Sequence, residues 1–187
     1  MNILVISGSR NPEGQTARAA KALLAGVESA GGQGELIFLP TLQIERCRQC
    51  DDNGWGLCRS EGRCVIDDDL APLVERIKVA DAVAFATPVY FGDLSESLRA
   101  FLDRMRRVYR HAADKDGVTG KRAVGICVAG GGGGGAPNCA VSLEKVLATI
   151  GFDVVDMIPA RRQNLDMKVK VLKVVGAWLV ESHKSQV

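Results

Sequence analysis

Four cysteines form the densest group of reactive side chains in this sequence. Cys47, Cys50, Cys58 and Cys64 lie within 18 residues, in the spacing C-x2-C-x7-C-x5-C. Thiolates are soft ligands that suit iron–sulfur clusters and zinc. Such density in a protein that keeps its thiols reduced favours metal or redox chemistry over a disulfide framework. Three interpretations stay open at this point: a four-iron–four-sulfur cluster, a structural zinc site and free thiols.

A loop rich in hydroxyl groups follows the first apolar run. Its candidate ligand-binding residues are Ser7, Ser9, Arg10, Gly14, Gln15 and Thr16. The start of a helix offers unpaired N–H groups and the positive end of its dipole, so a phosphate binds there readily. Ser9 and Thr16 can add hydroxyl donors, and Arg10 can add a charged one. The loop predicts a phosphate site, with an ordinary strand-to-helix turn as the alternative.

Two adjacent aromatic residues follow the third apolar run, in the sequence Thr-Pro-Val-Tyr-Phe-Gly-Asp at residues 87–93. Tyr90 and Phe91 come where a buried strand has just ended, and exposing both rings is costly unless they stack on a flat partner. An isoalloxazine ring, which needs apolar contact and a few backbone hydrogen bonds, is such a partner. The alternative is that both side chains pack inward against the neighbouring helix.

Six consecutive glycines at positions 130–135 follow the fourth apolar run. Glycine loses more backbone entropy on folding than any other residue, so a run of this length needs a use. Gly130, Gly131 and Gly132 would let a ligand ring approach unobstructed backbone N–H groups. A flexible linker is the alternative.

Apolar patterns of strand and helix length alternate along the chain and must position these loops. Strands are expected at residues 2–7, 35–39, 82–87, 123–129 and 154–158, and helices at 14–30, 67–79, 95–109, 138–150 and 165–182. Asp67, Asp68 and Asp69 are the N-cap candidates of the second helix. Five strands alternating with five helices predict a doubly wound α/β sheet.

The three unusual loops share one place in such a sheet. Ligands of doubly wound folds bind beyond the carboxyl ends of the parallel strands. The loops after the first, third and fourth strands all lie there. Their agreement predicts one crevice for a phosphorylated ligand with a flat ring.

Length and composition indicate one globular domain. The 187 residues are 47% hydrophobic and 25% charged, with a net charge of +2. This charge is too mild for a nucleic-acid partner, and the apolar runs are shorter than the ~18 residues of a membrane span. The first residues lack the basic n-region of a signal peptide. We expect a single cytoplasmic domain over residues 1–187, with a cysteine-rich loop inserted at about 41–67.

Several short motifs occur in an order that resembles a known family. They are the Gly-Ser-Arg to Gly-Gln-Thr loop, the clustered cysteines, Asp-Asp-Asp-Leu at 67–70, Ala-Asp-Ala at 80–82, Thr-Pro-Val-Tyr-Phe at 87–91 and Phe-Leu-Asp-Arg at 101–104. From Met1 to about Gly151 they resemble the NAD(P)H-dependent FMN reductase and iron–sulfur flavoprotein family. The resemblance implies a flavodoxin-like fold, a five-stranded parallel sheet in the order 2-1-3-4-5 with helices on both faces.

The resemblance also implies a cofactor, its contacts and its partners. FMN would be held at its phosphate by Ser9, Arg10, Gln15 and Thr16, and at its ribityl chain and ring by Pro88, Val89, Tyr90, Phe91 and Gly92, with the glycine run on another edge of the ring. NAD(P)H or a protein partner would reduce the flavin. A small acceptor or a ferredoxin-like carrier would take the electrons. Homodimers or homotetramers are usual in the family.

The cysteine spacing departs from the family pattern in one interval. Iron–sulfur members have about two residues between the second and third cysteines, where this chain has seven. Gly54 and Gly56 let the longer interval fold back toward the other three thiols. The cluster therefore stays among the expectations, beside zinc and free thiols.

The leading prediction is an FMN-dependent oxidoreductase in which the flavin does the chemistry, so we name no catalytic acid or base. The first alternative is a non-enzymatic electron carrier of the flavodoxin type, although such carriers are usually strongly acidic. A zinc-stabilised binding module is another. A phosphatase is disfavoured because no cysteine has an arginine at the required spacing. Four arginines, Arg104, Arg106, Arg107 and Arg110, are expected to form a solvated helix end, and Cys127 and Cys139 to be structural.

Overall fold

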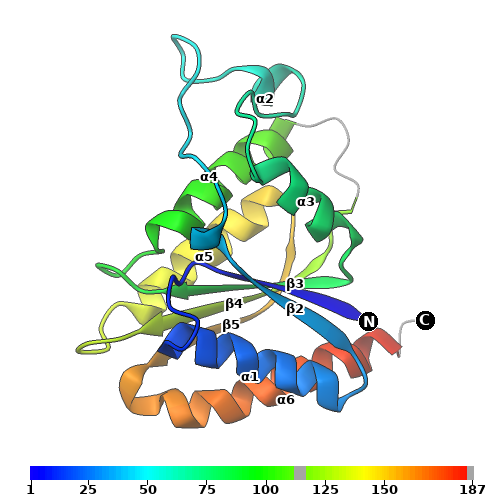
Figure 1. The fold of residues 1–187 in the computed structure, drawn as a ribbon, viewed down its shortest axis with the longest axis vertical. Helices are drawn as coiled ribbons and strands as arrows, with labels where there is room; N and C mark the ends of the chain where they lie inside the picture. Colours follow the sequence, from blue (N-terminus) through cyan, green and yellow to red (C-terminus); the bar gives the residue numbers. More distant parts are fainter. Residues whose placement is uncertain (112–116, 185–187) are drawn as a thin grey trace.

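A five-stranded parallel sheet lies between two layers of helices (Figure 1). The computed structural model describes residues 1–111 and 117–184. Its strands are β1 (Asn2–Ser7), β2 (Gln33–Phe38), β3 (Ala82–Pro88), β4 (Arg122–Ala129) and β5 (Asp153–Arg161). They pair in the order β2-β1-β3-β4-β5, and every pairing is parallel. The predicted doubly wound sheet and its strand order are confirmed.

Helices cover both faces of this sheet. The first face carries α1 (Gln15–Ser29) and α6 (Leu165–Lys184), and the second carries α3 (Leu70–Val79), α4 (Glu96–His111) and α5 (Ala136–Ile150). Successive strand residues point to opposite faces, so Ala84 packs toward α1 while Phe85 packs toward α4. Burial on both faces explains the continuous apolar runs of the sequence. Among the described residues, no helix has both the length and the hydrophobicity to cross a bilayer.

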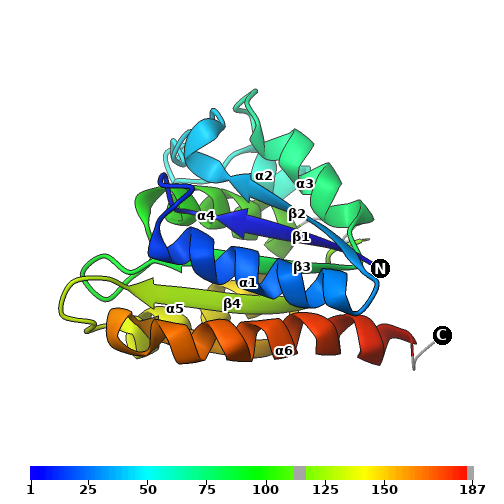
Figure 2. The ribbon, with the colours of Figure 1, turned by 60° about the horizontal axis from the view of Figure 1, so that its bottom comes forward.

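The two helices of the first face are in backbone contact (Figure 2). A Cβ atom at Gly26 of α1 would lie 2.0 Å from the carbonyl oxygen of Lys173 in α6. One at Gly176 of α6 would lie 2.1 Å from the carbonyl oxygen of Leu23 in α1. Glycine has no Cβ, so only glycine at both positions permits this approach.

The fifth strand is longer than predicted. It continues to Arg161, three residues past the expected end at Ile158, and this extension is paired with β4; the register shifts once, at Val155. Pro159 lies inside the extension, opposite Cys127. Proline cannot donate a hydrogen bond to a second neighbour, but β5 is at the sheet edge and has only one.

Asp69 is the N-cap residue of α3, as predicted, but its carboxylate does not bond the helix. It accepts the N–H group of Gln43 at 2.6 Å, whereas the Asp68 carboxylate accepts the N–H group of Leu70, the first residue of α3, at 3.1 Å and that of Glu45 at 2.9 Å. These aspartates therefore join the two ends of the cysteine-rich loop. The loop begins after a short 3-10 helix (Leu39–Thr41), contains α2 (Leu57–Ser60) and projects from the top of Figure 1.

Candidate functional site

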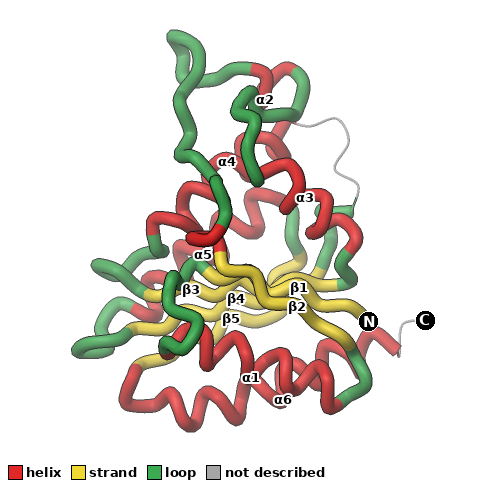
Figure 3. The backbone as a smooth tube through the Cα atoms, in the orientation of Figure 1, coloured by secondary structure: helices red, strands yellow, loops and turns green. Residues whose placement is uncertain are grey.

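The loops after β1, β3 and β4 come together at the carboxyl edge of the sheet (Figure 3). They border a cavity of about 470 Å³. Its wall is drawn from all three loops: Ser9, Gln15 and Thr16 from the first, Pro88, Val89 and Tyr90 from the third, and Gly130, Gly131, Gly132, Gly133 and Gly134 from the fourth. The crevice thus joins polar groups at one end to an apolar and aromatic wall at the other.

The polar end of this cavity is the start of α1. Ser9 and Thr16 are almost fully buried there, and no side chain caps the helix. The Oε1 atom of Gln15 is buried without a hydrogen-bond partner. A buried polar atom without a partner is costly, so a polar ligand fits this wall. Rotation of the Gln15 carboxamide presents N–H donors at the same place.

Several predicted contact residues lie outside the cavity wall. Ser7 is fully buried, and its hydroxyl accepts the N–H group of Ser9 at 3.2 Å. Gly14 is the residue before α1, and Arg10 is exposed beside it on the same loop. Ser7 and Gly14 therefore shape the loop, whereas Arg10 is free to turn toward an anion.

The loop after β3 is a tight turn that displays its aromatic residues. Tyr90 and Asp93 exchange two backbone hydrogen bonds of 3.0 Å, and the residues between them have positive φ angles, 50° at Phe91 and 80° at Gly92. Tyr90 is half exposed and Phe91 is fully exposed. The alternative in which both aromatic side chains pack inward is therefore wrong.

The six glycines do not share one role. Cβ atoms built at Gly130, Gly131 or Gly132 would meet nothing within 4 Å, so these residues face open space. A Cβ atom at Gly135 would lie 2.5 Å from the Cα atom of Gly92, and Gly135 has a φ of 81°. The last glycine thus lets the third and fourth loops touch, while the first three leave room beside the cavity.

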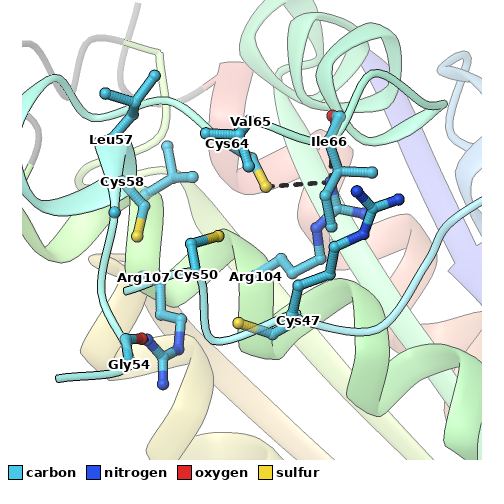
Figure 4. A pocket seen from close by; sticks show the side chains of 13 residues that line it. Cys47, Cys50, Gly54, Leu57, Cys58, Cys64, Val65, Ile66, Arg104 and Arg107 are labelled. Carbon is cyan, nitrogen blue, oxygen red and sulfur yellow. Dashed lines mark hydrogen bonds between the residues drawn. The ribbon is translucent and has the colours of Figure 1, made fainter. Parts of the chain in front are cut away.

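The four clustered cysteines line a second, smaller cavity. Cys47, Cys50, Cys58 and Cys64 surround it together with three arginines, Arg48, Arg104 and Arg107 (Figure 4). All four are free thiols. Among the described residues, no three side chains of the ligating types are grouped closely enough for a single metal ion. Four thiolates around one cavity are the donor set of a four-iron–four-sulfur cluster, in which each thiolate binds a different iron.

Arg104 was predicted to lie in a solvated helix end, and this is wrong. Its side chain is 1% exposed, and it pairs with Asp68, which is 6% exposed, at 2.5 Å. Burial lowers the pKa of Arg104, but its bonds to Asp68 and Cys64 outweigh this effect, so the pKa is raised and the guanidinium stays charged. Burial raises the pKa of Asp68, but the donors from Arg104, Glu45 and Leu70 prevail and lower it.

A sequence signal for this buried arginine existed. Arg104 follows Phe101 by three residues on the face of α4 that also carries Leu98 and Met105, all of them buried. A charge on an apolar face requires a buried partner, and the aspartates at 67–69 are the acidic run of the cysteine-rich loop. Spacing alone does not identify the partner, since Asp68 lies 36 residues away.

The two remaining cysteines are structural, as predicted. Cys127 of β4 and Cys139 of α5 are both fully buried in the core. A hydrogen bond with Cys139, together with burial, raises the pKa of Cys127. Neither thiol lines either of the two cavities.

The chain is similar to curated proteins named iron–sulfur flavoproteins. An iron–sulfur flavoprotein of Methanocaldococcus jannaschii is 33% identical over 131 residues, which cover 70% of this chain and 65% of that protein. Another, from Methanosarcina thermophila, is 32% identical over 104 residues, which cover 56% of this chain and 52% of that protein. The chain therefore spans about half to two-thirds of the length of these relatives.

Solved structures share the fold. A NAD(P)H:quinone oxidoreductase from Methanothermobacter marburgensis superposes with a TM-score of 0.71 at 21% identity, covering 96% of each chain. An archaeal flavodoxin superposes with a TM-score of 0.62 at 15% identity, covering 98% of this chain and 99% of that one. The fold is therefore flavodoxin-like, as the sequence resemblance implied.

A family model described as NADPH-dependent FMN reductase matches residues 1–164. The match covers β1 to β5 and therefore includes all three crevice loops and the cysteine-rich loop. The predicted resemblance is confirmed, and the chain belongs to the NADPH-dependent FMN reductase family.

Proposed function

We propose that the protein is an FMN-dependent oxidoreductase that takes electrons from NAD(P)H and passes them to a small acceptor or a ferredoxin-like carrier. One observation carries this proposal: a single cavity joins a helix start, where the Gln15 carboxamide oxygen is buried without a partner, to an apolar, aromatic wall. Membership of the family and the likeness to a NAD(P)H:quinone oxidoreductase support it.

The polar end of the crevice is the proposed phosphate site. Ser9 and Thr16 would donate hydroxyl hydrogens, and Gln15 would donate from its carboxamide. The start of α1 adds backbone N–H groups and the positive end of the helix dipole. Arg10, exposed on the same loop, would neutralise the remaining charge.

The other end is the proposed ring site. Pro88, Val89 and Tyr90 would form its apolar wall, and the N–H groups of Gly130, Gly131 and Gly132 would approach the ring edge. Phe91 and Gly92 remain predicted contacts. When bound, FMN supplies the redox chemistry by accepting a hydride from a nicotinamide and returning electrons singly or in pairs. The residues named here bind it, orient it and cover part of its surface.

We further propose that the four clustered thiolates hold a four-iron–four-sulfur cluster that exchanges electrons with FMN. The common cavity of the four cysteines and the names of the curated relatives support this assignment. The proposed assembly is a homodimer or homotetramer in the cytoplasm, where the free thiols would stay reduced.

The visible spectrum of the purified protein, recorded anaerobically, tests the proposal. We expect flavin bands, release of FMN on denaturation, and rapid bleaching by NADH or NADPH alone. Bound flavin that bleaches only with a protein donor would instead favour the flavodoxin-type carrier. A colourless protein that does not take up added FMN would contradict both.

A pair of variants tests the phosphate site. Thr16→Val removes a buried hydroxyl and should weaken FMN binding at least tenfold, which corresponds to about 1.4 kcal/mol. Thr149→Val is the matched control, because that hydroxyl is exposed on α5 and donates to the carbonyl of Lys145 in its own helix. Fluorescence titration with FMN measures the affinity of both variants. Equal affinities would show that Thr16 does not contact the phosphate.

A further inference from the structure

Arg104 is a charged side chain that is almost completely buried beneath the cysteine-rich loop. Besides its ion pair with Asp68, it donates to the carbonyl oxygens of Glu45 at 3.1 Å and Ile66 at 3.4 Å. Glu45 lies two residues before the first clustered cysteine, and Ile66 lies two residues after the last. One buried guanidinium therefore ties together both ends of the loop that carries the thiols.

The same guanidinium reaches a thiol directly. Its Nη2 atom lies 3.2 Å from the Sγ atom of Cys64, the contact drawn as a dashed line in Figure 4. Because Asp68 fixes the plane of the guanidinium through bonds of 2.5 and 3.0 Å, the donor aimed at sulfur is held in place. A flexible surface arginine could not hold such a donor in one orientation.

Arg107, one turn later on α4, holds the long interval between the second and third cysteines. Its Nη1 atom donates to the carbonyl oxygen of Gly54 at 2.6 Å, and its guanidinium lies 4.6 Å from the centre of the Trp55 ring. Arg59 lies 5.9 Å from the centre of the same ring. Gly54 and Trp55 belong to the seven residues that distinguish this spacing, so Arg107 folds back the segment that brings Cys58 to the cavity.

We infer that Arg104 and Arg107 are positioning residues of the four-thiolate site, with separate tasks. Arg104 tunes the site through its hydrogen bond to Cys64, and Arg107 assembles it by folding the long interval. The inference rests on the proposed iron–sulfur cluster. A hydrogen bond to a ligating sulfur stabilises the more negative, reduced state and so raises the reduction potential. Arg48, Arg104 and Arg107 also offset the charge of four thiolates around one cavity.

Substitutions in the full-length protein, reconstituted anaerobically with iron and sulfide, separate the two tasks. Arg104→Lys keeps the positive charge beside Asp68, but a lysine cannot maintain the forked pairing and also reach Cys64. We expect normal iron content and a more negative midpoint potential in an EPR-monitored titration. Arg107→Gln should instead lower the iron and acid-labile sulfide per chain by half or more, while the clusters that form keep the wild-type potential.

Arg106→Ala is the matched control. It lies on the same helix, pairs with Asp103 at 3.1 Å and does not line the cavity, so both readouts should stay at wild-type values. FMN affinity at the crevice, whose wall shares no residue with the cysteine cavity, reports whether each variant is folded. Should Arg104→Lys fail this check, the double variant Arg104→Met/Asp68→Leu replaces the buried ion pair by apolar side chains and keeps all four thiols, and the same more negative midpoint potential is expected from it.

The outcomes are distinguishable. A wild-type protein that takes up no iron or sulfide overturns the proposed cluster and this inference with it. A wild-type cluster whose potential is unchanged in Arg104→Lys overturns the tuning role of Arg104 alone. Full iron content in Arg107→Gln overturns the assembly role of Arg107 alone.

Discussion

The crevice at the sheet edge and the cavity in the cysteine-rich loop are built in opposite ways. The crevice is made where three strands end, and its key contact joins two backbones, at Gly92 and Gly135. The cysteine cavity lies beyond the sheet and is held by long side chains, Arg104 and Arg107, that reach out from α4. Topology therefore determines the first site, whereas individual ion pairs and hydrogen bonds determine the second.

The largest effect is expected from Asp68→Asn, which leaves Arg104 buried without its counter-charge. Breaking a buried pair of this kind costs about 3–5 kcal/mol in the free energy of unfolding. Urea denaturation measures this loss, and Asp103→Asn, at a half-exposed pair, should cost less than about 1 kcal/mol. Loop thiols should react faster with a thiol reagent, while folded protein keeps its FMN affinity. An equal loss of FMN affinity in the folded Asp68→Asn variant would show that the two sites do not form independently.

The same pair predicts a pH dependence. The pKa of Asp68 is lower in the folded protein than the value of about 3.9 expected after unfolding, so its stabilising contribution is complete above that pH. It is lost as the pH falls through the folded value. Stability measured between pH 5 and pH 2 should therefore decline less steeply in Asp68→Asn than in the wild type. Parallel slopes would show that Asp68 is not the responsible group.

A smaller effect, confined to the crevice, is expected from Gly135→Ala. The left-handed conformation costs a non-glycine residue about 1–2 kcal/mol, and the new Cβ atom would overlap Gly92. We expect weaker FMN binding by tenfold or more and unchanged reactivity of the loop thiols. Gly31→Ala is the control, because Gly31 has a similar φ of 82° outside the crevice wall and a Cβ there would meet only the Nζ atom of Lys184 at 3.9 Å. Equal losses of FMN affinity in the two variants would assign the effect to general destabilisation rather than to the contact with Gly92.

The smallest effect is expected from substitution of Phe91, in the loop after β3. Phe91 has a φ of 50° and a fully exposed ring, so Phe91→Gly should stabilise the protein by up to about 1 kcal/mol. If the ring contacts FMN, the same variant binds FMN more weakly. Phe91→Ala removes the ring but keeps the strained backbone, and should show the affinity loss without the gain in stability. Thermal unfolding and FMN titration together decide this.

Sequence reasoning succeeded where periodicity and topology decide the outcome. Strand order, helix order and the meeting of the loops after β1, β3 and β4 follow from alternating apolar patterns and the rule for parallel sheets. Element ends were less certain: Pro159 lies inside β5 because that strand is at an edge. Motif order also identified the family.

Sequence reasoning failed where one residue depends on a distant partner. A charged helix residue such as Arg104 is normally solvated, and only the folded chain shows that Asp68 crosses the loop to pair with it. Likewise, a run of six identical residues does not indicate that Gly135 contacts another loop while Gly130 faces open space. The contact between Arg107 and Trp55 could not be predicted, because it joins a helix to a loop that is distant in the sequence.

The glycine contact between α1 and α6 has a consequence for how the protein is made. The helix that begins at the phosphate loop rests against the last helix of the described chain, through Gly26 and Gly176. No α6 residue borders the crevice, yet during synthesis the apolar side of α1 stays uncovered until α6 leaves the ribosome. The nascent protein would therefore hold the proposed cofactor firmly only once α6 has been synthesised, and deleting α6 would weaken a crevice that α6 does not border.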